Sequence, residues 1–110
     1  MKKIDKEIKS FARLVYKLTR RIPRGKVVTY QTIARVMKNS GACRAVGNAL
    51  NRNPYAPLVP CHRVIKSNGE IGGFASGVDK KKKILKKEGV KITNNRIDLV
   101  KYGYKFKIKK

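Results

Sequence analysis

Apolar residues recur every three or four positions along most of the first half of this chain, and that spacing restricts these segments to helices. The longest stripe predicts a helix from about Asp5 to Arg21, with Asp5 as its N-cap. Two shorter stripes predict helices over residues 30–38 and 42–51, separated by a Gly-containing turn. Two short helices joined in this way form a helix-turn-helix pattern.

The segments around these helices predict a little extended structure. Residues 26–29 form a β-branched stretch before the second helix, and the three prolines of 54–60 predict a stiff, extended connection. Residues 67–69 predict a turn, after which 71–74 return as a hairpin or wing. We therefore expect an α+β fold that is mainly helical and resembles a winged helix-turn-helix.

The charge of the chain is far from balanced. Its 110 residues include 29 Lys and Arg but only 6 Asp and Glu, which gives a formal charge of +23. Such an excess predicts a polyanionic partner, either nucleic acid or an anionic membrane surface. The sequence has no Trp and no apolar run near the ~20 residues that span a bilayer, so nucleic acid is favoured and no membrane association is expected.

The N-terminus carries charged residues where a signal peptide would be apolar, which predicts a cytoplasmic protein with two free cysteine thiols. Near the other end, Asp79 is expected to cap a last helix over 80–88, and Gly89 to terminate it. We expect one domain at residues 1–92 and a basic extension at 93–110. We expect the protein to be a monomer. Alternating apolar residues make the extension either a short strand pair or a basic tail that orders on DNA.

The second helix of the turn motif presents a polar face. Arg44, Asn48 and Arg52 follow each other at intervals of four, opposite the apolar stripe. Such a face is either simply solvated or turned toward nucleic acid, and the charge of the chain favours nucleic acid.

Cys61 and His62 are the residues with the clearest chemistry. A cysteine is a strong nucleophile as the thiolate, and His62, the only histidine of the chain, could accept its proton. Adjacent residues of a strand point to opposite faces, so contact between them requires a tight turn or a bridging water. Pro60 makes such an irregular backbone plausible.

Three other interpretations compete for this pair. Cys61 could be a small buried apolar residue, as we expect for Cys43. A zinc site is disfavoured, because one His and two Cys cannot complete four ligands. A cysteine hydrolase is also disfavoured, because its Cys and His lie far apart in sequence.

The string Pro60-Cys61-His62-Arg63-Val64 resembles the active-site signature of the O6-alkylguanine-DNA alkyltransferase family. The resemblance extends from about Phe11 to Val90. Its flanking segments are Thr29-Tyr30-Gln31, Arg44-Ala45-Val46-Gly47, Arg52-Asn53-Pro54 and Lys87-Glu88-Gly89.

The resemblance implies a single-turnover methyltransferase without metal or cofactor. Cys61 would attack the alkyl carbon on O6 of a flipped-out guanine and keep the alkyl group. His62 would take the thiol proton through a water, and Glu88 would orient the imidazole. Tyr30 would protonate the departing base, and Asn53 would brace the active-site turn.

The resemblance also implies that the partner is double-stranded DNA containing O6-alkylguanine. Arg44 would enter the base stack where the flipped nucleotide had been. The expected DNA-binding residues are Tyr30, Arg44, Ala45, Gly47, Asn48, Arg52 and Arg63. The expected base-pocket residues are Val64, Gly73, Phe74, Ala75 and Ser76.

The chain departs from the family pattern in three ways. Phe74 stands where a tyrosine is usual, the family's N-terminal domain is missing, and residues 93–110 lie beyond the matched region. We expect the extension to add non-specific DNA affinity, with a purely structural hairpin as the alternative. Two other functions remain open, a non-catalytic alkyltransferase-like lesion binder and a plain winged-helix regulator, and a reactive thiol at Cys61 distinguishes the methyltransferase from both.

Overall fold

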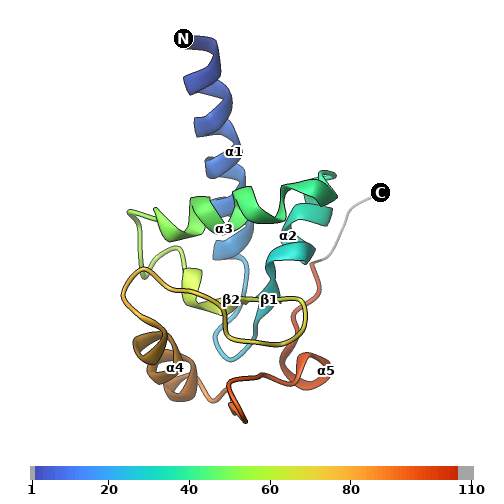
Figure 1. Ribbon diagram of the computed structural model, residues 1–110, viewed down its shortest axis with the longest axis vertical. Helices are drawn as coiled ribbons and strands as arrows, with labels where there is room; N and C mark the ends of the chain where they lie inside the picture. The colour runs from blue at the N-terminus through green and yellow to red at the C-terminus, as the bar shows by residue number, and fades with distance from the viewer. Residues whose placement is uncertain (1, 107–110) are drawn as a thin grey trace.

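The computed structural model describes residues 2–106, with side chains from residue 10 onward. Three helices form one end of the molecule, a small sheet lies at its centre, and two further helices form the other end (Figure 1). The elements are α1 (Lys2–Arg20), β1 (Val28–Thr29), α2 (Tyr30–Val36), η1 (Ser40–Ala42), α3 (Cys43–Asn51), η2 (Cys61–Arg63), β2 (Val64–Ile65), α4 (Val78–Lys87) and α5 (Leu99–Tyr102). The predicted α+β, mainly helical fold is confirmed. No helix of residues 2–106 is long and apolar enough to cross a membrane.

Helix α1 begins earlier than the sequence pattern predicted. Asp5 lies within the helix and therefore does not cap it, which corrects that expectation. The C-terminal half of α1 and the residues after it bury Val15, Leu18 and Ile22 against α2 and α3. The apolar stripe at this end of α1 thus packs into the core, as its helical spacing predicted.

Helices α2 and α3 form the predicted helix-turn-helix. Thr29 caps α2, because its Oγ1 accepts a hydrogen bond from the Thr32 amide at 3.0 Å. The short 3₁₀ turn η1 occupies the start of the predicted second helix, so α3 begins at Cys43. Its buried side chains are Val46, Ala49 and Leu50, whereas Ala45, predicted in the apolar stripe, is exposed.

The central sheet joins two segments that are far apart in sequence. Strands β1 and β2 run parallel, with Val28 opposite Val64. After β2 the predicted turn at 67–69 is present, with the Lys66 amide bonded to the Glu70 carbonyl at 2.9 Å. The returning segment does not pair with β2 as a hairpin; the Ile71 amide instead donates to the Asn95 carbonyl.

The connection at 54–60 is a series of turns and not the extended segment that its prolines predicted. Its backbone folds back on itself, because the Val59 amide bonds to the Tyr55 carbonyl at 3.1 Å. This compact loop delivers the chain directly to Cys61.

Helix α4 begins at Val78 with Gly77 as its N-cap, so Asp79 lies in its first turn and does not cap it. Its end matches the prediction. Gly89 has a φ of +91°, and the bonds from Gly89 to Lys86 and from Val90 to Leu85 close the helix.

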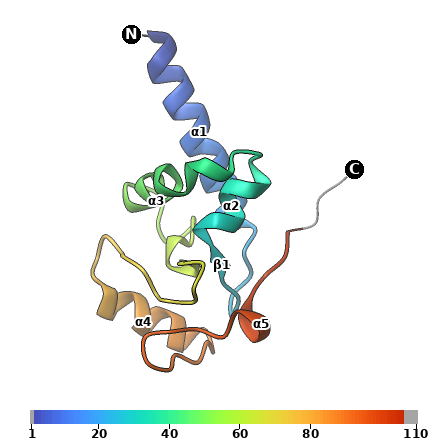
Figure 2. The ribbon, with the colours of Figure 1, turned by 45° about the vertical axis from the view of Figure 1, so that its right-hand side comes forward.

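The C-terminal segment forms neither a strand pair nor a tail within residues 93–106. It contains helix α5, capped by Asp98 and at the same end of the molecule as α4 (Figure 2), together with isolated bridges: Gly103 pairs with Val27 in parallel, and Arg96 pairs with Glu70 and Thr93 in antiparallel. Ile97 is buried in the core cluster beneath α4, and Phe106 is buried in the cluster around α1. The segment is therefore part of both cores, and residues 107–110 lie outside the described range. The domain boundary at 92/93 stays a prediction.

Candidate functional site

Cys61 begins the one-turn helix η2, between the proline-rich loop and β2. Backbone bonds from Cys61 to the Val59 carbonyl and from Arg63 to the Pro60 carbonyl, at 2.8 and 2.9 Å, form this turn. The backbone at Cys61 is therefore irregular and not extended, which agrees with the expectation drawn from Pro60. Cys61 is half-buried, whereas His62 is buried.

His62 is held by Glu88 at the C-terminal end of α4, with Nε2 and Oε2 2.9 Å apart. Burial lowers the pKa of His62, and the bond and negative charge of Glu88 only partly oppose this effect. The imidazole is therefore mainly neutral at neutral pH. When Nε2–H donates to Glu88, Nδ1 is left as the proton acceptor.

Glu88 also binds Arg63 through both carboxylate oxygens. Arg63 Nε donates to Oε1 at 2.9 Å, Nη2 donates to Oε2 at 2.8 Å, and Nη1 donates to the Ile22 carbonyl at 2.8 Å. Burial alone would raise the pKa of Glu88, but the bonds from Arg63 and His62 outweigh it and lower that pKa. The guanidinium of Arg63 is thus turned inward, and the expected contact of Arg63 with DNA stays a prediction.

Asn53 ties down the loop that precedes Cys61. Its Nδ2 donates to the Val59 carbonyl at 2.8 Å, and its Oδ1 accepts from the Tyr55 amide at 2.9 Å. One side chain thus links both ends of the loop, which is the bracing geometry expected from the sequence.

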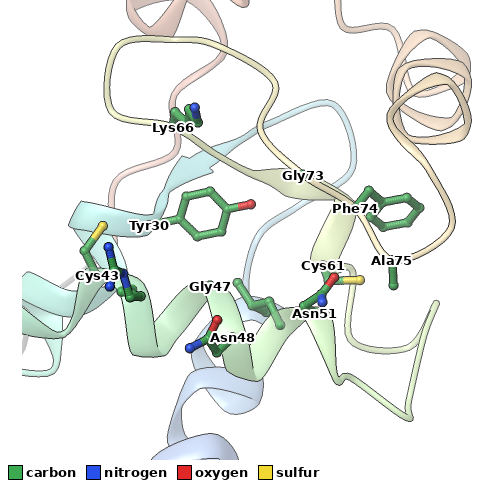
Figure 3. A pocket seen from close by; sticks show the side chains of 12 residues that line it. Tyr30, Cys43, Gly47, Asn48, Asn51, Cys61, Lys66, Gly73, Phe74 and Ala75 are labelled. Carbon is green, nitrogen blue, oxygen red and sulfur yellow. The ribbon is translucent and has the colours of Figure 1, made fainter.

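A pocket of about 620 Å³ opens beside Cys61, between α3 and the loop before α4 (Figure 3). This volume is within the usual range for small-molecule pockets. The residues that the sequence predicted and that line it are Tyr30, Arg44, Gly47, Asn48, Cys61, Gly73, Phe74 and Ala75. The lining residues that it missed are Cys43, Leu50, Asn51 and Lys66.

Besides His62, Arg63, Glu88 and Asn53, four predicted site residues do not line this pocket. Val64 has a fully buried side chain in the core, so only its main chain could contact a base, and its assignment to the base pocket stays a prediction. Ser76 is exposed in the turn before α4 and is also outside the pocket lining. Ala45 and Arg52 are exposed on the outer side of α3, where they stay predicted DNA contacts.

Tyr30, the first residue of α2, points its hydroxyl across the pocket toward the segment of Gly73, as Figure 3 shows. Burial raises the pKa of Tyr30, and negative charge on Cys61 and Cys43 raises it further. The phenol is therefore a proton donor. Gly72 makes room for it, because a Cβ there would lie 3.3 Å from the hydroxyl oxygen.

Lys81 is a residue of this site that the sequence analysis missed. Its side chain is completely buried, and its Nζ donates to the carbonyls of Val64 and Gly73 at 2.8 and 3.1 Å. The sequence does not distinguish Lys81 from the other lysines in the same run of α4. Lys81 does, however, precede buried Leu85 by one helical turn, so both lie on the same face of the helix. That spacing is the signal that could have identified it.

The two cysteines lie on opposite sides of the Tyr30 ring in Figure 3 and are free thiols. Within residues 2–106, no three side chains of His, Cys, Asp or Glu gather so that they could hold a metal ion. The chemistry available at the pocket is therefore that of a thiol, an imidazole–carboxylate pair and a phenol.

Comparison with known proteins bears on this arrangement. A family model described as the DNA-binding domain of 6-O-methylguanine DNA methyltransferase matches residues 10–90. The methylated-DNA--protein-cysteine methyltransferase of Sulfolobus acidocaldarius is 47% identical over 89 residues, which are 81% of this chain and 56% of that protein. The chain spans about half the length of such curated relatives.

Two solved structures share the fold. Schizosaccharomyces pombe Atl1, in complex with damaged DNA containing O6-carboxymethylguanine, has a TM-score of 0.81 at 35% identity and covers 88% of this chain and 96% of its own. Mycobacterium tuberculosis OGT in complex with DNA has a TM-score of 0.69 at 41% identity, and the match covers 71% of this chain and 48% of that chain. The helix-turn-helix-like fold class is thereby confirmed.

Proposed function

Because this chain belongs to the 6-O-methylguanine DNA methyltransferase family, we propose that it repairs alkylated DNA by moving an alkyl group from O6 of guanine to Cys61. Each molecule acts once. The observation that carries the proposal is the position of Cys61 on a pocket, in the same turn as a buried His62 bonded to Glu88.

The thiol is activated through His62. A water relays the Cys61 proton to the neutral imidazole, and the Glu88 carboxylate stabilises the resulting positive charge. Arg63 keeps that carboxylate ionised and in place by its bidentate bond. The sulfur then bonds to the alkyl carbon in line with the carbon–oxygen bond that breaks.

The leaving group is the guanine, whose electron pair from the broken bond is neutralised by a proton on a ring nitrogen. The Tyr30 phenol supplies that proton from the middle of the pocket. The product at Cys61 is a thioether, which has no route back to a thiol within this site. The transfer is therefore stoichiometric and requires no cofactor.

DNA binds on the exposed side of α3 in this proposal. Arg44, Ala45 and Asn48 are exposed there, and Arg44 lies at the pocket rim, where it can replace the flipped nucleotide in the stack. Gly73 and Phe74 form the wall against which the extruded base lies. The DNA complexes of Atl1 and M. tuberculosis OGT support this partner, and a location with DNA inside the cell is part of the same proposal.

The alternative is lesion binding without alkyl transfer. It is favoured by the likeness to Atl1, which covers 88% of this chain and 96% of that chain. The intact combination of Cys61, His62 and Glu88 favours the transferase, because a pure lesion binder has no use for an activated thiol.

The deciding experiment is the intact mass of the protein after incubation with a duplex that contains one O6-methylguanine. We expect a gain of one methyl group, located at Cys61, in a single stoichiometric step. Cys61→Ser abolishes the gain, whereas Cys43→Ser, which changes the other thiol of the same pocket, retains it. Tight binding of the lesion duplex without any change in mass would mean that the protein is a lesion binder.

A further inference from the structure

The ammonium group of Lys81 is buried without a counter-ion. Lys81 is the largest fully buried side chain of the described residues, and within them no carboxylate lies in ion-pair distance of its Nζ. Burying a charge in this manner is costly, and proteins retain such groups mainly at functional sites. Its two partners are main-chain carbonyls, which bind the ammonium without neutralising it.

Those carbonyls belong to two different elements. Val64 is in β2, directly after the turn that carries Cys61, and Gly73 is in the loop between β2 and α4, called here the wall loop because it lines the pocket. The bonds at 2.8 and 3.1 Å therefore hold the wall loop against β2 from behind. Lys81 Nζ also lies 5.8 Å from the centroid of the Tyr30 ring, so the ammonium reaches the proposed proton donor.

The titratable groups that face Lys81 are Cys61 and His62 of η2 and Tyr30 of α2. Burial lowers the pKa of Lys81 to about 8, and negative charge on Cys61 opposes this lowering. The positive charge of Lys81 helps to keep His62 neutral.

We propose that Lys81 is a positioning residue of this site, which holds the pocket wall at Gly73 against β2, directly after the turn that carries Cys61, and keeps a positive charge beside the Tyr30 ring. This inference rests on the proposed role of Cys61 as the alkyl acceptor. Lys81 itself touches neither the base nor the alkyl group.

The test measures the Cys61 thiol without DNA. Iodoacetamide labelling of Cys61, followed by mass spectrometry, gives the reaction rate against pH below 8, where the ammonium keeps its proton. In Lys81→Met, which retains the length and loses the charge and both carbonyl bonds, we expect the labelling rate to fall about tenfold at each pH in this range. Methyl transfer from the lesion duplex at neutral pH then falls about tenfold, while lesion-duplex affinity is unchanged.

Two further variants separate the charge from the fold. Lys80→Met removes an exposed lysine next to Lys81 in α4 and should leave both rates at wild-type values. Lys81→Arg keeps a positive charge and should restore the labelling rate toward wild type. Circular dichroism establishes that each variant is folded.

The inference is overturned if the curve of folded Lys81→Met coincides with that of wild type, or if Lys81→Arg is labelled as slowly as Lys81→Met. A wild-type protein that reacts with iodoacetamide but never accepts methyl from DNA would contradict the proposed function alone. The labelling curves would still decide the role of Lys81.

Discussion

Glu88 is the residue that holds the polar side of the site together. His62 and Arg63 both bond to its carboxylate, and the three side chains are largely shielded from water. Inside a protein such bonds are stronger than at the surface, and an unpaired member is correspondingly costly. Single changes in this group should therefore affect stability and reactivity together.

Glu88→Gln keeps the shape of the side chain and removes its charge. We expect a loss of about 3 kcal/mol in the free energy of unfolding, because Arg63 stays buried without its counter-ion. Methyl transfer should slow by about 100-fold, because the imidazolium of His62 is no longer stabilised. Urea titration and single-turnover mass spectrometry measure the two effects.

A matched control is Glu70→Gln, which removes the exposed pair of Glu70 and Arg96, whose charged groups are 3.7 Å apart. That change should cost under about 0.5 kcal/mol.

The dependence of stability on acid pH is a second test of the role of Glu88. Since the pKa of Glu88 is lower in the folded chain than its ordinary 4.5, its stabilisation is present above that pH and is lost as the pH falls through the folded value. Equal acid sensitivity in wild type and Glu88→Gln would contradict this account.

At the scale of elements, the loop between β2 and α4 decides the shape of the pocket. Two adjacent glycines of this loop have different surroundings. Gly72 has a φ of +78° and faces the Tyr30 hydroxyl, whereas a Cβ on Gly73 would meet no atom within 4 Å. Only the first is required by the backbone and by the neighbouring ring.

Gly72→Ala should therefore impair the site. The matched control is Gly41→Ala, which lies outside the pocket and whose added Cβ would meet no atom within 4 Å. We expect Gly72→Ala to cost about 1 kcal/mol of stability through its left-handed backbone and to slow methyl transfer by displacing Tyr30. Thermal unfolding and the transfer rate measure the two effects. If the variants behave alike in both assays, the close approach of Gly72 to Tyr30 does not matter for the reaction.

At the scale of the whole molecule, the C-terminal segment joins the two cores of the protein. Ile97 is buried under α4, while Val100 in the neighbouring helix α5 is 96% exposed. If the segment is part of the folded unit, Ile97→Ala should cost about 3 kcal/mol, and Val100→Ala should cost almost nothing. Chemical denaturation distinguishes this result from that of a detachable tail, for which both variants would match wild type.

The local pattern of the sequence was enough to predict helices α1 to α4, the turn motif and the irregular segment around Cys61, but not helix α5. Helical spacing is visible within a few turns of chain, and the residues from Pro60 to Val64 are contiguous, so neither requires knowledge of distant segments. The bonds of Asn53 are equally local, since its partners lie within six residues, but its bracing role was implied by the family resemblance and not by spacing.

Only the tertiary structure decided where the long cationic side chains go. Arg63 turns inward because α4 brings Glu88 to it, 25 residues away in sequence. Lys81 is buried because Val64 and Gly73 present carbonyls to it, whereas its neighbour Lys80 is exposed. The sequence contains the same residue type in both cases. Burial of a charged side chain requires polar partners, here a carboxylate or main-chain carbonyls. Folding brings these partners together from distant segments, so they cannot be inferred from spacing along one helix.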